Sequence, residues 1–462
     1  MSTVTLTFLG ATETVTGSRT LISTSDTQVL VDAGLYQGPS SVEDKNWEKL
    51  AVDPATIDAI ILTHAHLDHC GYLPRLVRLG FEGKIYATEY TRALAAVVLY
   101  DSAYLQMEDT KYAKKKGYSR HKNPEPLYNT EDVERTLSLF QEVDFRSAVK
   151  ISDSVSATFY PSGHILGSAF VMVEADSKRI IFTSDMGRSN HPILVAPDAP
   201  PVLHYDAVVS ESTYGDRVHD TPTSAFAEEI NAAIKRGGSI LIPAFAVDRT
   251  EVILMALHDL IDSKQIPAVP IFVDSPMALA SLNHYREAIV TDAAEIRPEM
   301  KKLYATTDPF NPGTLEEMNT VDQSKSLNER TDSGIIISAS GMATGGRVVH
   351  HLANMLPNSK NTVILVGFQA TGSRGRALEQ GAQSLRIHGD QVPVKAHIAK
   401  VESFSVHADS DELIAWLRNI EKPGQAFVVH GEPESSSFLA QRITHELGWP
   451  AKVPVFGKQI EI

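Results

Sequence analysis

The chain has 462 residues, of which 43% are hydrophobic and 21% charged, values typical of a globular protein with a substantial core. A net charge of −15 argues against nonspecific binding of nucleic acid by the whole surface, but it allows a local basic groove. No apolar stretch approaches the roughly 20 residues that span a bilayer, and the N-terminus lacks a signal-peptide pattern, so we expect a cytoplasmic protein without membrane contact.

Short β-rich runs between turn signals dominate the first part of the chain. The runs expected to be strands are residues 4–9, 29–31, 59–62, 85–87, 157–160, 170–173, 180–182 and 207–209. Helical spacing of apolar residues predicts helices at 72–79, 91–116 and 131–141. Together these elements indicate sheets covered by helices.

From about Tyr214 the chain alternates longer helices and strands. Helices are expected at 224–235 and 249–262, and strands at 239–243, 270–273, 334–339 and 361–367. This alternation is typical of a parallel, doubly wound α/β domain. After about Pro393 short strands return, including 425–429. The sequence therefore predicts one domain formed by 1–212 and 394–462, with a second domain, 213–393, inserted into it.

Residues 63–69, Thr-His-Ala-His-Leu-Asp-His, follow one of the predicted strands and precede a predicted helix. Imidazole and carboxylate groups suit Zn²⁺, and ligands that leave a coordination position open make a catalytic site. The chain's single cysteine excludes thiolate zinc clusters. The motif therefore predicts a hydrolytic dinuclear metal centre, with a chance cluster of surface histidines as the alternative.

Three further residues stand at the ends of apolar runs, where neighbouring strands can bring their side chains together. They are Asp32 after Val31, His164 in Pro-Ser-Gly-His, and Asp185 in Phe-Thr-Ser-Asp. Any one of them alone is explained as an ordinary turn residue. Together with the histidine motif, they indicate one shared metal site.

The ordered set Asp32, His64-His66-Asp68-His69, His164 and Asp185 resembles the successive motifs of the metallo-β-lactamase superfamily. The resemblance implies an αββα sandwich with two zinc ions at one edge. It assigns His64, His66 and His164 to one zinc, and Asp68 and His69 to the other. Asp185 would bridge both ions, and Asp32 would orient a ligand or the metal-bound water.

Three more segments resemble motifs A, B and C of the β-CASP nucleases: 208–215 with Glu211, 404–409 with His407, and 427–432 with His430. The resemblance implies an α/β β-CASP domain inserted into the metallo-β-lactamase fold. RNA-acting members carry histidine in motif C, where DNA-acting members typically carry valine. The resemblance also implies that His430 completes the second zinc site and that Glu211 and His407 form a hydrogen-bonded acid pair.

The predicted insertion carries its own signals. The small-residue segment with Ser338, Ser340 and Gly341 resembles a family loop whose amides and hydroxyls can hold a phosphate, although a tight turn is an equal reading. Arg374 and Arg376 are candidate phosphate contacts, with a solvated loop as the alternative. Two other features give weaker evidence about function. The basic tract 111–122 is better explained as an exposed helix end than as an RNA contact, and Asp248 occupies a position where relatives often carry glycine.

The resemblance implies a zinc-dependent ribonuclease acting on single-stranded RNA. A dinuclear-metal hydroxide mechanism would leave 5′-phosphate and 3′-hydroxyl ends. The alternatives are a hydrolase of a small lactam, thioester or lactone, a DNA nuclease of the same superfamily, and a noncatalytic RNA-binding scaffold. Endonuclease or 5′ exonuclease action stays open, as does homodimer formation.

Overall fold

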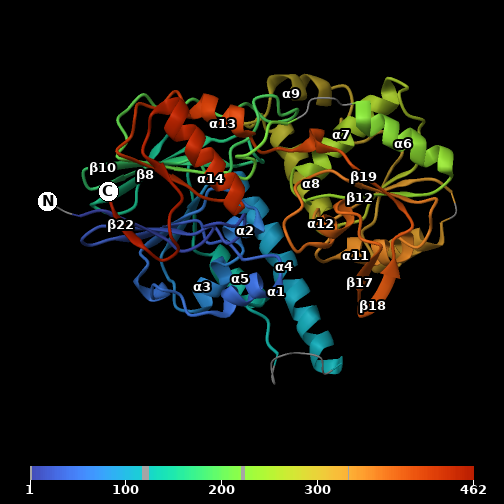
Figure 1. The fold of residues 1–462 in the computed structure, drawn as a ribbon, viewed down its shortest axis with the longest axis horizontal. Helices are drawn as coiled ribbons and strands as arrows, with labels where there is room; N and C mark the ends of the chain where they lie inside the picture. Colours follow the sequence, from blue (N-terminus) through green and yellow to red (C-terminus); the bar gives the residue numbers. More distant parts are fainter. Residues whose placement is uncertain (1–2, 117–123, 220–223, 331) are drawn as a thin grey trace. The chain divides into compact units, whose positions relative to one another are not determined.

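The computed structural model describes residues 3–116, 124–219, 224–330 and 332–462. The chain divides into two compact units, one formed by Met1–Val218 with Val406–Ile462 and the other by His219–Ser405 (Figure 1). The boundaries predicted from the sequence are 212/213 and 393/394, and the compact units change at 218/219 and 405/406. The second boundary lies later because β19 (His397–Lys400) pairs with β16 (Thr362–Leu365) of the inserted unit.

Two seven-stranded sheets form the first unit within its described residues. The first sheet has the order β22 (Gln459–Glu461), β1 (Thr5–Phe8), β2 (Thr20–Ser23), β3 (Gln28–Val31), β4 (Ala59–Ile61), β5 (Lys84–Ala87) and β6 (Phe140–Glu142). The second has the order β21 (Ala451–Lys452), β20 (Gln425–Val428), β11 (Ala207–Ser210), β10 (Lys178–Phe182), β9 (Ala169–Ala175), β8 (Val155–Pro161) and β7 (Ala148–Lys150). Each sheet therefore combines strands that precede the inserted unit with strands that follow it.

The two sheets share one apolar core, in which the Phe8 and Phe427 rings lie 5.1 Å apart. Helices cover their outer faces (Figure 1). On the side of the first sheet these are α1 (Ser40–Glu43), α2 (Leu67–Cys70), α3 (Leu73–Arg78), α4 (Glu89–Lys116) and α5 (Thr130–Leu137). On the second sheet, α13 (Ser410–Leu417) and α14 (Pro433–Arg442) pack through Leu413, Leu417 and Leu439. This arrangement is the expected αββα sandwich.

One predicted helix is wrong over its last residues. The spacing predicted a helix over 131–141, but α5 ends at Leu137 and Phe140–Glu142 form strand β6. These three residues pair in parallel with Ile85–Ala87 of β5. Tertiary strand pairing therefore overrides the local helical spacing.

The inserted unit contains a six-stranded sheet whose strand pairs all run parallel among the described residues. Its order is β14 (Leu315–Glu317), β13 (Ile271–Val273), β15 (Ile335–Ser338), β12 (Ile240–Pro243), β16 and β19. Its α-helices are α6 (Ser224–Arg236), α7 (Arg249–Asp262), α8 (Pro276–Val290), α9 (Pro298–Tyr304), α10 (Val321–Ser326), α11 (Arg347–Met355) and α12 (Arg374–Glu379). Strands β17 (Ser384–Ile387) and β18 (Asp390–Pro393) form a separate hairpin. The doubly wound α/β prediction is thus confirmed.

Asp248 has a φ of 70°, a left-handed conformation that favours glycine over other residues. Its carboxylate accepts a 2.5 Å hydrogen bond from the Tyr285 hydroxyl. The following residue, Arg249, is buried and donates through Nη1 to Val366 O at 2.5 Å. The side chain of Asp248 therefore supplies a contact that glycine could not make, while Arg249 has a structural partner.

A buried carboxylate, Asp274, follows β13 and organises this end of the sheet. It accepts hydrogen bonds of 2.6 Å from each of Ser324, Arg347 and His351. Its own main-chain carbonyl accepts a 2.9 Å hydrogen bond from Ser338, the last residue of β15. Burial would raise the pKa of Asp274, but the bonds from His351, Ser324 and Arg347 outweigh burial and lower it.

Replacing Asp274 with asparagine should lower the free energy of unfolding at pH 7 by about 3 kcal/mol, because removing one partner leaves the Arg347 charge without its buried counterion. Since the folded-state pKa is lowered, this contribution is complete above about pH 3.9, the value of an unfolded aspartate. This contribution disappears as the pH falls through the pKa that Asp274 has in the folded protein, which is lower than that of an unfolded aspartate. Urea unfolding of the full chain at several pH values measures both effects, with the exposed-site variant Asp390→Asn as control. Equal unfolding free energies for Asp274→Asn and wild type would contradict the assignment.

Candidate metal centre

Several candidate site residues of the first unit directly follow strands. Asp32 follows β3, His64 follows β4, Asp185 follows β10, Glu211 follows β11 and His430 follows β20. In each sheet these strands pair in parallel. β3 pairs with β4 in the first sheet, and β11 pairs with both β10 and β20 in the second. Parallel neighbours bring their carboxyl ends to the same edge, so the loops gather there.

One cluster consists of His64, His66, His164 and Asp185, with one donor atom of each within 4.8 Å of the others. His66 Nδ1 lies 3.2 Å from His164 Nε2. Asp185 Oδ2 lies 3.5 Å from His64 Nε2 and 3.6 Å from His164 Nε2. This is the donor set that the resemblance assigned to the first zinc together with Asp185.

A second cluster consists of Asp68, His69 and His430. His430 Nε2 lies 3.1 Å from His69 Nε2 and 3.4 Å from Asp68 Oδ2. Asp185 Oδ1 lies 3.3 Å from His69 Nε2. Asp185 therefore faces the first cluster with Oδ2 and the second with Oδ1, as a bridging carboxylate would.

The donor geometry fits divalent metal ions. Two ligands on a tetrahedral zinc, each about 2.0–2.1 Å from it, lie roughly 3.3 Å apart, close to the spacing of the facing imidazole nitrogens. Among the described residues, His64 Nε2 and Asp185 Oδ1 are buried and have no hydrogen-bond partner. Buried polar atoms without a partner are costly, and a bound cation would satisfy them.

The charge states of the first cluster also suit a metal. Burial lowers the pKa of His64 and of His164 well below the usual range, and lowers the pKa of His66 to about 4. These imidazoles are therefore neutral at pH 7, the form that binds metals. Burial would raise the pKa of Asp185, but His430, His69 and His64 outweigh it and hold the pKa well below the usual range, so Asp185 is a carboxylate.

Asp32 lies outside both clusters and orients one of their members. Its Oδ2 accepts a 2.7 Å hydrogen bond from His69 Nδ1, and its Oδ1 accepts from the Thr63 amide at 2.9 Å. This leaves His69 Nε2 directed at the second cluster. A carboxylate behind a ligating imidazole fixes the ring and raises its basicity.

Glu211 and His407 lie close to each other. His407 Nδ1 lies 3.4 Å from each carboxylate oxygen of Glu211. Glu211 is 2% exposed, and its Oε1 accepts a 2.6 Å hydrogen bond from the Met186 amide. Glu211 also lies within 4.8 Å of Asp185 and His430, so the pair adjoins the second cluster.

Gly187 allows three of these loops to approach one another. It forms an isolated bridge with His407, and a Cβ built at Gly187 would overlap the carbonyl of Gly163, next to His164. Replacing Gly187 with alanine should therefore lower the free energy of unfolding by about 1–3 kcal/mol and reduce metal content. Thermal unfolding and elemental analysis check this, with Gly345→Ala as control because a Cβ there meets open space. Wild-type stability and metal content in Gly187→Ala would refute it.

The predicted phosphate-binding residues lie in the inserted unit, near one another. The Ser338 hydroxyl donates to Asp274 O, and Ser340 Oγ accepts from the Thr344 amide at 3.0 Å. Arg374 Nη1 donates to the carbonyls of Ala343 and Thr344, which follow Gly341 in the same loop, and burial lowers the pKa of Arg374. Arg376 Nη1 lies 3.3 Å from Glu379. Both arginines thus have partners within the unit.

Some residues of the metal centre were not predicted. Thr63 donates to Asp32 and lies 3.2 Å from His64 Nδ1, and Thr213 lies 3.1 Å from His430 Nδ1. Thr63 lies within the histidine segment 63–69 and Thr213 within motif A, and that position is the only signal that the sequence offers for a role. Gly187, two residues after Asp185, gives no signal at all without the fold.

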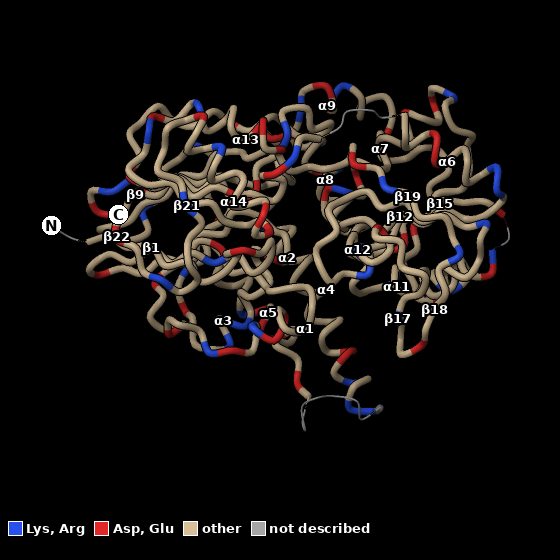
Figure 2. The backbone as a smooth tube through the Cα atoms, in the orientation of Figure 1, with Lys and Arg blue, Asp and Glu red and all other residues tan. Residues whose placement is uncertain are grey.

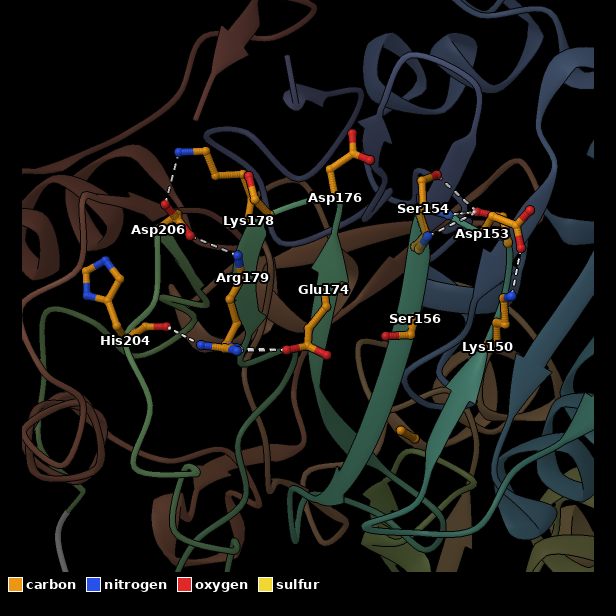
Figure 3. Close-up of a pocket in the computed structure, with 14 residues that line it drawn as sticks. Lys150, Asp153, Ser154, Ser156, Glu174, Asp176, Lys178, Arg179, His204 and Asp206 are labelled. Carbon is orange, nitrogen blue, oxygen red and sulfur yellow. Dashed lines mark hydrogen bonds and ion pairs between the residues drawn. The ribbon is translucent and has the colours of Figure 1, made fainter. Parts of the chain in front are cut away.

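A small cavity of about 30 Å³ adjoins the second cluster and is lined by Asp32, His69, Asp185, Glu211 and His430 among others. This is room for about one or two waters. A larger open pocket of about 660 Å³ lies on the outer face of β7 to β10 (Figure 3). Several of its charges pair with each other, as in Lys150 with Asp153 and Arg179 with Glu174. Among the described residues, none of the clusters of metal donors lies in this pocket.

Three family profiles match the chain. Residues 15–233 match the metallo-beta-lactamase superfamily, 250–378 the Beta-Casp domain, and 391–454 the Zn-dependent metallo-hydrolase RNA specificity domain. A crystal structure of a protein of unknown function from Enterococcus faecalis V583 is similar in fold, with a TM-score of 0.54 at 13% identity over 100% of both chains. The fold and the donor set define a metal-dependent hydrolase.

Two relatives are similar over nearly their whole length. "Ribonuclease TTHA0252" of Thermus thermophilus is 34% identical over 98% of this chain and 99% of its own. The "RNase J-like protein" of Methanocaldococcus jannaschii is 31% identical over 99% of this chain and 100% of its own. This chain belongs to the β-CASP family of the metallo-β-lactamase superfamily.

Basic and acidic residues are interspersed along both units (Figure 2). In the part of the chain that the structure describes, no helix is both long enough and apolar enough to cross a bilayer.

Proposed function

We propose that this protein is a zinc-dependent ribonuclease that hydrolyses phosphodiester bonds of single-stranded RNA to 5′-phosphate and 3′-hydroxyl ends. The observation that carries the proposal is the joining of the two donor clusters through Asp185, with the Glu211–His407 pair beside the second. The names of the two relatives and the description of the C-terminal profile support RNA as the substrate. We place this activity in the cytoplasm, in RNA processing or decay.

His64, His66 and His164 would hold one ion, Asp68, His69 and His430 the other, and Asp185 both. Bound ions would supply Lewis acidity and a nucleophilic water near pH 7, and would offset charge that develops on the phosphate. Asp32 would keep the His69 ring in place through its 2.7 Å hydrogen bond.

His407 would act as the general acid. Glu211, buried and fixed by the Met186 amide, lies 3.4 Å from His407 Nδ1 and would hold the ring in one orientation. The ring's Nε2 would then deliver a proton to the departing 3′ oxygen. Without this proton the leaving group would depart as an alkoxide, which is the less favourable path.

A small-molecule hydrolase and a DNA nuclease are the alternatives. A lactam or thioester needs no second domain, whereas the inserted unit, His219–Ser405, takes up a large part of this chain, and motifs A to C are all present. His430 in motif C favours RNA over DNA.

Product mapping tests the proposal. Purified protein with zinc is incubated with RNAs of one sequence that carry a 5′ phosphate, a 5′ triphosphate or no ends, the last as a circle. Matching DNA and a panel of lactams and thioesters are run in parallel. Cleavage of RNA to 5′-phosphate ends is expected, and cleavage of the circle would establish endonuclease action. Turnover of a lactam, a thioester or DNA in preference to RNA would overturn the proposal.

A further inference from the structure

The segment that carries Glu211 makes contacts beyond the acid pair. The next two residues, Ser212 and Thr213, are buried and touch the loop that carries His430. The Ser212 hydroxyl donates to Val429 O at 2.7 Å, and its amide donates to His430 O at 3.2 Å. Thr213 Oγ1 lies 3.1 Å from His430 Nδ1 and 3.3 Å from His430 O.

The Thr213 hydroxyl can set which nitrogen of His430 carries the proton. The hydroxyl has one proton, and the carbonyl of His430 can only accept it. Oγ1 is then left to accept a hydrogen bond from His430 Nδ1–H. Asp185 Oδ1 is a more distant neighbour of Nδ1, at 3.4 Å. Nε2 is thereby the nitrogen with a lone pair, and it is the one that faces His69 and Asp68.

Contacts with other segments also fix the backbone of the loop that carries His430. His430 has a φ of 54°, a left-handed conformation that costs a non-glycine residue about 1 kcal/mol or more. Its amide donates to Ala11 O at 2.7 Å. A Cβ on Gly431 would overlap Ser212, so the loop and this segment are in close contact. Such strain persists only where the surroundings fix the backbone.

We propose that Thr213 is a positioning residue for the second metal site, its hydroxyl holding the His430 ring so that Nε2 faces the ion. The inference rests on the two-ion centre of the proposed function. It gives the segment 211–213 two tasks, since Glu211 holds the acid His407 while Thr213 holds a ligand of the neighbouring ion.

Three variants of the full chain test this. Thr213→Val removes the hydroxyl at nearly constant shape, and Thr213→Ser keeps it. Thr136→Val is the matched control, because Thr136 is fully buried and its hydroxyl donates only to Asp132 O within its own helix. Zinc per chain is measured by elemental analysis after dialysis against a graded series of chelators.

Thr213→Val should retain one ion and bind the other 10–100-fold more weakly, the usual cost of losing a residue that orients a ligand. Thr213→Ser and Thr136→Val should hold two ions with wild-type affinity. The inference is overturned if Thr213→Val holds both ions normally, if Thr213→Ser loses one as well, if Thr136→Val loses one, or if the wild type binds only one. The test measures zinc per chain and not RNA cleavage. A wild type that binds two ions but leaves RNA intact would therefore contradict the proposed function without contradicting the role of Thr213.

Discussion

Replacing His66 with alanine is expected to remove zinc and ribonuclease activity together. His66 Nδ1 lies 3.2 Å from His164 Nε2 in the first cluster, so the substitution deletes one of the three imidazoles available to that ion. Loss of that ion would also leave Asp185 without a cation beside Oδ2, which would weaken its link between the two clusters. We expect zinc per chain to fall from two to one or fewer, and activity to fall at least 1,000-fold, roughly the loss of what metal-activated water contributes.

Elemental analysis and cleavage of labelled RNA measure both quantities. His258→Ala is the matched control, since His258 is also partly buried but belongs to neither cluster. Full zinc content in His66→Ala would contradict the ligand assignment, and full activity with zinc lost would contradict the metal-dependent mechanism.

His407→Ala should show the opposite division, with activity lost and zinc retained. Neither donor cluster that the resemblance assigned to an ion includes His407, so both ions should stay bound. Loss of a general acid typically lowers turnover by 10²–10⁴-fold. Since Glu211 acts through His407, the variant Glu211→Gln should cost little more when His407 is already alanine.

Single-turnover cleavage and zinc analysis on His407→Ala, Glu211→Gln and the double variant form a complete cycle. Additive losses from the two single variants would mean that the residues act separately. Zinc loss equal to that of His66→Ala would remove the distinction between ligand and acid.

The sequence was most informative for the metal site, because closely spaced histidines and aspartates have few other roles in proteins. Four ligands within six positions mark a metal site without any structure, and Asp32 and Asp185 follow from their places after strands. The parallel sheet of the inserted unit was likewise visible, and α7 begins and ends where its apolar spacing predicted, at Arg249 and Asp262.

The rest depends on contacts between distant segments. Thr213 and His430 are separated by 217 positions, and Asp274 and His351 by 77, so no local pattern announces their pairing. Gly187 matters only because the loop of His164 passes directly over it. Strand β6 was predicted as helix because its partner β5, more than fifty residues away, decides its conformation.

The separation of 361 positions between His69 and His430 has a consequence for synthesis. At 5–20 residues per second, a ribosome needs between about 20 and 70 s to pass from one ligand to the other. The strand β22 that borders β1 is made later still. A nascent chain therefore carries its first histidine motif for most of its translation without the partner that completes the second cluster. A chain that ends before His430 lacks one donor of the second cluster. If the proposed function holds, the messenger RNA being translated would therefore not meet a complete nuclease before the protein is finished.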